Sequence, residues 1–290
     1  MTRRRIRHID AFTTEPLAGN PAAVVDGDGL DPATMQRIAL NQKLSETVFL
    51  LPPESGGAHA RLRIFTPAAE LPFAGHPIVA AAHAIVEEGL VPRAEGAALR
   101  LETGAGVIPV DVTAGPPARY TMTQAAPSFR PVDVSVAAVA AAVGLGERDI
   151  VRLEYVSTGL EWLIAQVAPD AMARVAPDAP ALRTLMLAVF CVDAGRAEAP
   201  VRVRAFPVAQ GIAEDPVTGS ANGCIAALIA RDRLLPAPGG EIAYVAEQGL
   251  EMGQPGRVYA SVAAGDGAPR VRIGGHAVTV LRGDLLLDGA

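Results

Sequence analysis

The chain is poor in the residues on which several common mechanisms depend. It contains one lysine, Lys43, and two cysteines, Cys191 and Cys224, among 290 residues. Two cysteines are too few for a disulfide framework and lack the spacing of a metal motif, so we expect both to be reduced, buried thiols. Lys43 lies beside a polar Asn-Gln pair, whereas a Schiff-base lysine must be desolvated. The sequence therefore disfavours a disulfide-stabilised fold and a Schiff-base mechanism.

Long apolar runs and basic stripes are also missing. No apolar run approaches the roughly 18 residues that a membrane span needs. The basic N-terminus leads into residues 6–12, where His8 and Asp10 interrupt any signal-peptide core. The net charge of −6 comes without a basic stripe that would contact nucleic acid. We therefore expect a cytoplasmic protein that binds neither a membrane nor a nucleic acid.

What the chain has instead is a repeat. Glu70-Leu71-Pro72-Phe73-Ala74-Gly75-His76 returns as Glu214-Asp215-Pro216-Val217-Thr218-Gly219-Ser220, with Pro two residues and Gly five residues after the glutamate in both copies. An Arg-x-Phe sequence precedes each copy, at Arg63 and at Arg204. The copies are 144 residues apart, almost half of the chain. This spacing indicates an internal duplication, and 290 residues are enough for two domains with separate cores.

Each half is predicted to contain one buried helix among strands. Residues 78–88 and 221–231 are almost wholly apolar or small, which is typical of a helix enclosed by the protein. Asp31 and Pro32 suit the N-cap and the first position of a further helix over residues 31–40. Shorter helices are expected at residues 134–143 and 179–185. Apolar or alternating runs predict strands at residues 6–12, 22–25, 47–51, 61–65, 99–102, 107–112, 119–124, 163–167, 187–192, 201–206, 241–244, 257–262, 270–273 and 277–282.

The predicted fold class is α+β, because the strands and helices do not alternate as βαβ units. We place the first domain at residues 1–125, joined by a C-terminal strand at residues 277–290, and the second domain at residues 126–276. Residues 125–131, which include two prolines, are the expected linker between them.

Both copies of the repeat place a glycine turn directly before a helix. The first turn of a helix has free backbone N–H groups at the positive end of its dipole, which suits a carboxylate or an oxyanion. Gly75 and Gly219 begin these turns, and Ser220 adds a hydroxyl donor. If a pseudo-twofold axis relates the halves, both helix starts converge on one cleft between the domains. The alternative is two ordinary helix starts with Ser220 as a simple N-cap, but the matched spacing of the copies favours a site.

Three ionisable residues are candidates for proton transfer. His76 lies in the first turn of its helix, where the dipole disfavours the charged form, so we expect a neutral imidazole that can relay a proton. Asp215 directly precedes the second turn, and capping or solvation is its alternative role. Glu46 lies where a polar segment meets the apolar strand at 47–51, and partial desolvation there would raise its pKa and suit it to general acid–base catalysis. The alternative for Glu46 is a solvated loop position.

Together these residues resemble the PhzF family of phenazine biosynthesis. The resemblance spans nearly the whole chain and implies the diaminopimelate epimerase fold. In that fold two pseudo-symmetric α+β domains each form a barrel-like, mostly antiparallel sheet around a central helix. It also implies a homodimer. The segments that carry it are Asp10-Ala11-Phe12, Leu17-Ala18-Gly19-Asn20-Pro21, Leu44-Ser45-Glu46, Phe65-Thr66-Pro67 and both copies of the repeat, the first extended to Pro77 and the second to Ala221.

The resemblance further implies a cofactor-independent isomerase that uses no metal. Its substrate is expected to be trans-2,3-dihydro-3-hydroxyanthranilate or another small cyclic molecule that bears a carboxylate. Carried over by motif, Glu46 is the catalytic acid and base, and His76 and Asp215 assist it. The residues then expected to bind polar groups of the anionic substrate are Asn20, Ser45, Gly75, Gly219 and Ser220.

One departure from other enzymes of this fold concerns thiols. Epimerases and racemases of the fold use two opposed cysteines directly before the signature glycines, where this chain has Ala74 and Thr218. Both bases of a two-thiol racemase are therefore missing, and a single carboxylate moves a proton between two carbons on one face of a substrate. We therefore predict an isomerisation.

Two alternatives to this isomerase remain open. One is an amino-acid epimerase or racemase of the same fold, which the missing thiols disfavour. The other is a non-catalytic protein that binds small anions. Binding alone needs no base, so the joint presence of Glu46, His76 and Asp215 argues against it.

Overall fold

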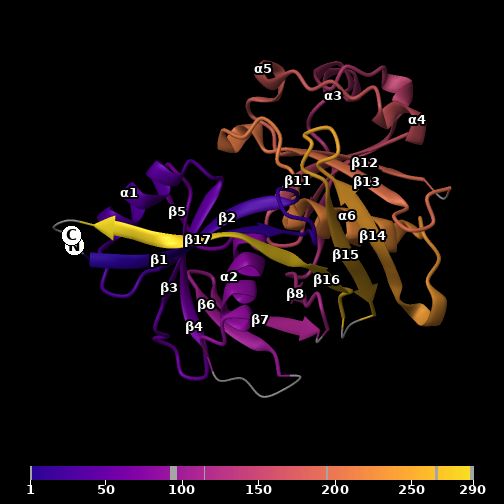
Figure 1. The fold of residues 1–290 in the computed structure, drawn as a ribbon. Helices are drawn as coiled ribbons and strands as arrows, with labels where there is room; N and C mark the ends of the chain where they lie inside the picture. Colours follow the sequence, from indigo (N-terminus) through magenta and orange to yellow (C-terminus); the bar gives the residue numbers. More distant parts are fainter. Residues whose placement is uncertain (1, 92–96, 114, 194, 265–266, 288–290) are drawn as a thin grey trace. The chain divides into compact units, whose positions relative to one another are not determined.

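The computed structural model describes residues 2–91, 97–113, 115–193, 195–264 and 267–287. The chain divides into two units (Figure 1). Unit 1 consists of residues 1–122 and 274–290, and unit 2 consists of residues 123–273. Each unit has its own strands, its own apolar core and its own long buried helix.

Unit 1 places one helix, α2 (Gly75–Glu87), against a mixed sheet. Its strands are β1 (Thr2–Ala11), β2 (Asn20–Asp26), β3 (Glu46–Leu51), β4 (Ala60–Phe65), β5 (Glu70–Leu71), β6 (Leu99–Thr103), β7 (Gly106–Thr113), β8 (Arg119–Thr123) and β17 (Ala277–Leu287). Neighbours follow the order β17-β1-β2-β3-β4-β6-β7-β8, in which β2–β3 and β4–β6 are parallel and the others antiparallel. Figure 1 shows α2 among these strands, and it packs against β1 to β4 and β17.

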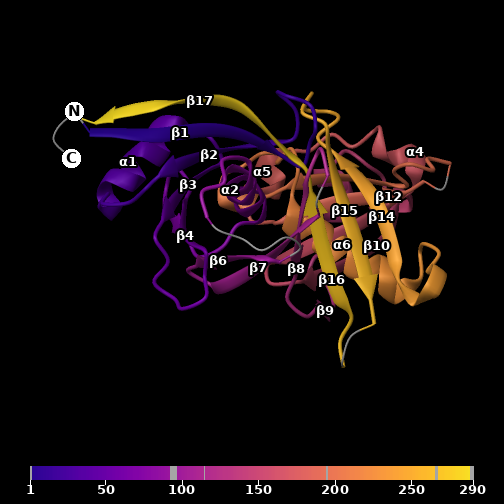
Figure 2. The same cartoon turned by 60° about the horizontal axis from the view of Figure 1, so that its bottom comes forward.

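Unit 2 is built in the same way around α6 (Gly219–Asp232), which packs against three of its strands. The strands are β9 (Ser128–Arg130), β10 (Ile150–Ser157), β11 (Glu161–Val167), β12 (Leu187–Val192), β13 (Val201–Phe206), β14 (Ile242–Gln248) and β15 (Gly256–Ala263), followed by β16 (Arg270–Gly275) at the boundary with unit 1. They pair in the order β9 to β15, with β11–β12 and β13–β14 parallel. Shorter helices are α3 (Val136–Ala142), α4 (Pro169–Met172) and α5 (Ala179–Leu182), and Figure 2 shows these elements from a second side.

The two units repeat one order of strand pairing. Across β1-β2-β3-β4-β6-β7 the pairs alternate between antiparallel and parallel, and the same alternation runs across β10-β11-β12-β13-β14-β15. In both units the long helix lies in the chain between the fourth and fifth strands of this order. The predicted fold class, α+β with two similar domains that each hold a mostly antiparallel sheet around a helix, is confirmed.

Local sequence explains the helix boundaries of unit 1. Asp31 caps α1 (Pro32–Gln42) by accepting hydrogen bonds from the backbone N–H groups of Ala33 and Thr34, as predicted. Helix α2 begins at Gly75, three residues before the predicted start at residue 78. Pro77 explains the difference, because the first turn of a helix needs no N–H from that position.

Two predictions in unit 2 were wrong in detail, and one strand was missed. The expected linker at residues 125–131 contains β9, which pairs with β10 as part of the sheet. Strand β10 itself was missed, although Ile150 to Val156 partly alternates apolar and polar residues. The helix expected at residues 179–185 is the single turn α5. Short strands between prolines and one-turn helices give too few residues for a period to show.

The C-terminal end of α2 is fixed by a buried arginine. Arg7 on β1 is 1% exposed, and its guanidinium donates two hydrogen bonds to Glu88, at 2.8 and 2.7 Å, and one to Asp26 at 2.5 Å. Glu88 is the C-cap residue of α2. The hydrogen bonds from Arg7 lower the pKa of Glu88 to about 2. This cluster, together with Arg5, clamps one end of the helix whose other end carries His76.

This ion pair predicts a loss of stability in acid. The pKa of Glu88 is lower in the folded protein than the usual value near 4.3. The ion pair therefore makes its full contribution to the free energy of unfolding above about pH 4.5, and this contribution is lost as the pH falls toward 2. Urea unfolding at pH 6 and at pH 3 should show a smaller pH dependence for Glu88→Gln than for the wild type. The exposed control Glu241→Gln should keep the wild-type dependence, and equal curves for both variants would contradict the assignment.

Candidate functional site

The N-terminus of α2 is open, by which we mean that no side chain caps it. The N-cap residue of α2 is Ala74, which has no side chain that can accept a hydrogen bond from the first turn. Gly75 and His76 form the first turn, and His76 is buried at 7% exposure. This end of α2 therefore has the positive end of the helix dipole without a side-chain cap, an arrangement that suits an anion.

Glu46, His76 and Ser45 come together at this helix start. Glu46 is the first residue of β3, and its Oε2 lies 3.2 Å from Nε2 of His76. The hydroxyl oxygen of Ser45 lies 3.5 Å from the same imidazole nitrogen. A carboxylate and an imidazole at this separation can exchange or share a proton. Unit 1 thus brings together three of its five predicted site residues, and Gly75 adjoins them in sequence.

Glu46 occupies an environment that disfavours its charged form. The residue is 8% exposed, so its position is not the solvated loop considered as the alternative. Burial raises the pKa of Glu46, and a hydrogen bond from Ser45 opposes the rise. Within the part of the chain that the structure describes, Oε2 is buried and has no partner in hydrogen-bond geometry. A buried carboxyl with an unsatisfied oxygen gains from taking up a proton, as a general base does.

Asn20, the remaining candidate of unit 1, lies at the start of β2. It is 1% exposed and pairs with Ala11 across the β1–β2 ladder. The turn before it requires glycine, because Gly19 has φ +66° and a Cβ there would lie 2.2 Å from the carbonyl oxygen of Ala11. Asp10 closes the same loop by accepting a hydrogen bond from the N–H of Leu17 at 2.8 Å. The loop places Asn20 on the strand next to β3.

In unit 2 the second copy of the repeat positions Asp215. An isolated bridge joins Asp215 to Ala205 on β13, and the residue is 8% exposed. Its neighbour Glu214 accepts two hydrogen bonds from Arg204, at 2.8 and 2.7 Å. Unit 1 contains the same arrangement, in which Arg63 donates to Glu70 at 2.7 and 2.6 Å. The Arg-x-Phe sequence before each copy therefore anchors the glutamate that opens it.

Gly219 and Ser220 form the first turn of α6. The N-cap residue Thr218 makes no side-chain cap, so this helix start is also open. The indole N–H of Trp162 donates a hydrogen bond to Ser220 Oγ at 3.1 Å. With its oxygen accepting from Trp162, the Ser220 hydroxyl keeps its hydrogen for another acceptor. Unit 2 thus brings Asp215, Gly219 and Ser220 to one end of α6.

Sequence reasoning missed two buried amides at this place, Gln248 and Asn222. Gln248 ends β14 and is 1% exposed, and Asn222 lies in α6 and is fully buried. Both are hydrogen-bonded to Thr218. Gln248 is 30 residues away from Thr218 in the chain, so no local pattern could have found it. The fold alone reveals this contact.

Both cysteines are free, buried thiols, as predicted. Cys224 lies in α6, six residues after Thr218. Burial raises the pKa of its thiol to about 12. It also raises the pKa of Cys191. A thiol needs to ionise to act as a base or nucleophile, so neither cysteine is suited to replace those of a two-thiol racemase.

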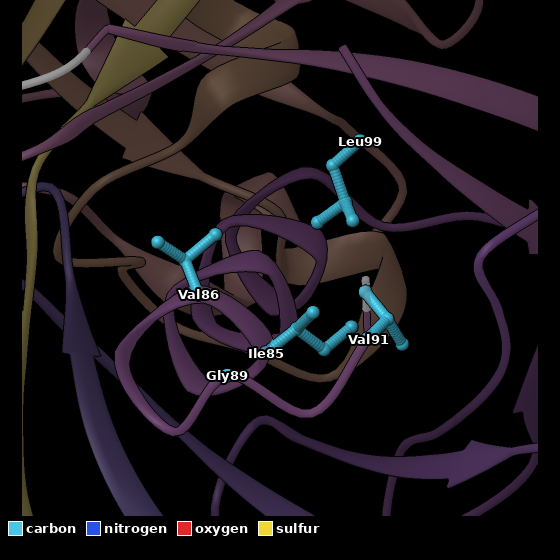
Figure 3. Close-up of a pocket in the computed structure, with 5 residues that line it drawn as sticks. All are labelled: Ile85, Val86, Gly89, Val91 and Leu99. Carbon is cyan, nitrogen blue, oxygen red and sulfur yellow. The ribbon is translucent and has the colours of Figure 1, made fainter. Parts of the chain in front are cut away.

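Other candidate features carry no chemistry of their own. A hollow of about 190 Å³ at the C-terminal end of α2 is lined by apolar residues and one glycine, namely Ile85, Val86, Gly89, Val91 and Leu99 (Figure 3). The described residues were also compared with the requirements of a metal site and of a membrane span. No group of three or more metal-binding side chains is found among them. No helix of the described chain combines the length and hydropathy of a membrane span.

Comparison with known proteins relates the chain to a family. Residues 9–283 match the model of a family described as phenazine biosynthesis-like protein, PhzC-PhzF. The trans-2,3-dihydro-3-hydroxyanthranilate isomerase of Pseudomonas aeruginosa is 37% identical over 95% of this chain and 96% of its own length. An uncharacterized isomerase of Mesorhizobium japonicum is 36% identical, covering 96% of this chain and 97% of that protein.

A solved structure gives the same result for the fold. The crystal structure of a PhzF-family phenazine biosynthesis protein from Bacillus anthracis aligns with a TM-score of 0.89 and 32% identity. The alignment covers 99% of this chain and 100% of that protein. The likeness therefore extends over both units of the chain.

Proposed function

The chain belongs to the phenazine biosynthesis-like protein family and is an isomerase of that family, and from this premise we propose that it transfers a proton within a small cyclic carboxylate without a cofactor. The proposed substrate is trans-2,3-dihydro-3-hydroxyanthranilate, because the relative from Pseudomonas aeruginosa bears the name of that isomerase. The observation that carries the proposal is Glu46, a buried carboxyl with a raised pKa, 3.2 Å from His76 at an open helix start.

In the proposed reaction the Glu46 carboxylate takes a proton from an activated C–H bond, and the electron pair of that bond moves into the conjugated system. Glu46 then returns the proton to another carbon of the same system, so no atom is gained or lost. A raised pKa makes the carboxylate a stronger base for the first step. Its contact with His76 provides a second group that can orient the substrate or relay a proton.

Substrate binding is proposed to use both helix starts. The N-termini of α2 and α6, at Gly75 and Gly219, lack side-chain caps and offer N–H groups to a carboxylate or to developing negative charge. Asp215 would accept a hydrogen bond from an amine or hydroxyl group of the same substrate. Asn20, Ser45 and Ser220 are proposed to bind its remaining polar groups. We also propose that the protein acts as a homodimer in the cytoplasm.

The test is direct turnover of the proposed substrate. The purified protein is incubated with trans-2,3-dihydro-3-hydroxyanthranilate while its ultraviolet band is followed, and a second reaction in D₂O is followed by proton NMR. We expect the band to disappear together with positional isomerisation. A lack of turnover would contradict the proposed substrate. Deuterium incorporation without positional isomerisation would instead support the epimerase alternative.

A further inference from the structure

Gln248 joins three parts of unit 2 through one buried amide. It stands at the end of β14, where its side chain reaches the loop that carries Asp215 and the first turn of α6. The residue is 1% exposed, so its hydrogen bonds are made inside the protein. Burying an amide without hydrogen-bond partners destabilises the folded protein, so each hydrogen bond of Gln248 is expected to be needed at this place.

Backbone groups fix the orientation of this amide. Oε1 accepts a hydrogen bond from the backbone N–H of Thr218 at 3.1 Å, and an N–H can only donate. Nε2 donates to the carbonyl oxygen of Asp215 at 2.9 Å, and a carbonyl can only accept. Asn222 adds a second donor to Oε1 at 2.9 Å. If the amide were reversed, its N–H₂ group would face the N–H donors of Thr218 and Asn222, and its oxygen would face the carbonyl oxygen of Asp215. The orientation described here is therefore the one that satisfies these groups.

The fixed amide in turn sets the direction of the Thr218 hydroxyl. The second hydrogen of Nε2 points to Thr218 Oγ1 at 3.0 Å, and this oxygen must accept because an amide nitrogen does not. The single hydrogen of the hydroxyl is then left for its other partner, Oδ2 of Asp215. The direction of donation therefore runs from Gln248 through Thr218 to the carboxylate.

We propose that Gln248 is a positioning residue that acts through Thr218 to keep Asp215 Oδ2 a hydrogen-bond acceptor. A hydrogen bond donated to a carboxylate favours its ionised form. Asp215 is thereby suited to receive a donor group, such as the protonated amine of a zwitterionic substrate, and is unsuited to give up a proton. The catalytic meaning of this inference rests on the proposed function of Asp215.

Glu214, the residue before Asp215, takes part in an ion-pair cluster of unit 2. Glu214 is held by Arg204, whose Nε also lies 4.0 Å from Glu251. These charges remain in place when Thr218 or Gln248 is changed. Thr218→Val removes the hydrogen bond from Thr218 to Asp215 and leaves this ion-pair cluster unchanged.

Two variants test the relay without changing the size of a side chain much. Thr218→Val removes the hydroxyl, and Gln248→Glu keeps an acceptor for the Thr218 N–H but loses the donor. Thr218→Ser keeps the hydroxyl and should behave as the wild type. Gln210→Glu adds the same charge at an exposed position five residues before Asp215 and controls for the change in net charge.

The readout is the titration of Asp215 itself, which needs no substrate. Aspartate labelled with ¹³C at Cγ is incorporated, and the Asp215 resonance is identified by its loss in Asp215→Asn. In Thr218→Val we expect the titration midpoint to rise by about one pH unit or more, and in Gln248→Glu we expect a larger rise because the introduced carboxylate also repels that of Asp215. Thr218→Ser and Gln210→Glu should leave it unchanged. If either network variant folds and titrates as the wild type does, the proposal is overturned.

Turnover measured beside the titration separates this inference from the proposed function. If the titration shifts while the wild type fails to convert the substrate, Gln248 is a positioning residue and the proposed function is wrong. If the wild type is active, the acidic limb of its kcat/KM profile should move to higher pH in both network variants and in neither control. An active enzyme whose profile is the same in all five proteins would overturn the inference alone.

Discussion

Glu46→Gln is expected to lower kcat for the proposed isomerisation by roughly 10²- to 10⁴-fold, the range that a general acid–base contributes. Glutamine has nearly the size of glutamate and can still contact Ser45 and His76, but its amide cannot accept a proton from carbon. KM should change little, because the carboxylate is proposed to act on the reacting C–H bond. The ultraviolet assay and a kcat and KM determination would measure both effects.

Stability separates a catalytic role of Glu46 from a structural one. Burial of a carboxylate with an unsatisfied oxygen is unfavourable, so Glu46→Gln should unfold at the same urea concentration as the wild type or at a higher one. Glu15→Gln, at an exposed position of the same unit, is the matched control and should keep full activity. Equal kcat for Glu46→Gln and the wild type would remove Glu46 from the mechanism.

The second large effect is expected from Arg204→Met, which should cost about 3–5 kcal/mol of unfolding free energy. Arg204 is 7% exposed, and its removal leaves the Glu214 carboxylate without its partner in a largely buried place. The carbonyl oxygen of Val175 loses a hydrogen bond at the same time. Urea unfolding followed by circular dichroism would measure the loss of unfolding free energy. Activity should also fall, because Glu214 directly precedes Asp215.

The duplicated pair in unit 1 provides the control. Arg63 and Glu70 make the same two-fold contact, but the Glu70 side chain is 42% exposed. Water replaces a lost partner there, so Arg63→Met should cost about 1 kcal/mol or less. The two pairs share the same two-fold contact, and they differ in burial and in the additional hydrogen bond from Arg204 to the carbonyl oxygen of Val175. Similar losses for the two variants would show that burial does not set the strength of this pair.

Much of the architecture was predictable because each copy of the repeat consists of residues that are close together in the chain. The spacing from glutamate to proline to glycine identified both helix starts, and the run of small and apolar residues after each identified α2 and α6. The cap at Asp31 followed from one residue type before a proline. These features depend on neighbours in the chain, and they are the ones that sequence alone can show.

Features that depend on distant contacts could not be predicted in the same way. Glu46 was a candidate from its place at a polar boundary, but sequence position alone favoured a solvated loop, and its catalytic role came from the family resemblance. Its burial and its contact with His76 arise when β3 is placed beside α2, 30 residues away. Gln248 shows no local signal, and only the pairing of β14 with its neighbours brings it to Thr218.

The hydrogen bond between Trp162 and Ser220 has a practical consequence. Trp162 is the only tryptophan of the chain, it is 1% exposed, and its indole N–H is bonded at the open start of α6. Indole emission responds to changes in this bond and in the charge near the ring. The protein therefore contains an intrinsic fluorescent reporter at one proposed binding position, and ligand affinity can be titrated in variants that have lost all turnover.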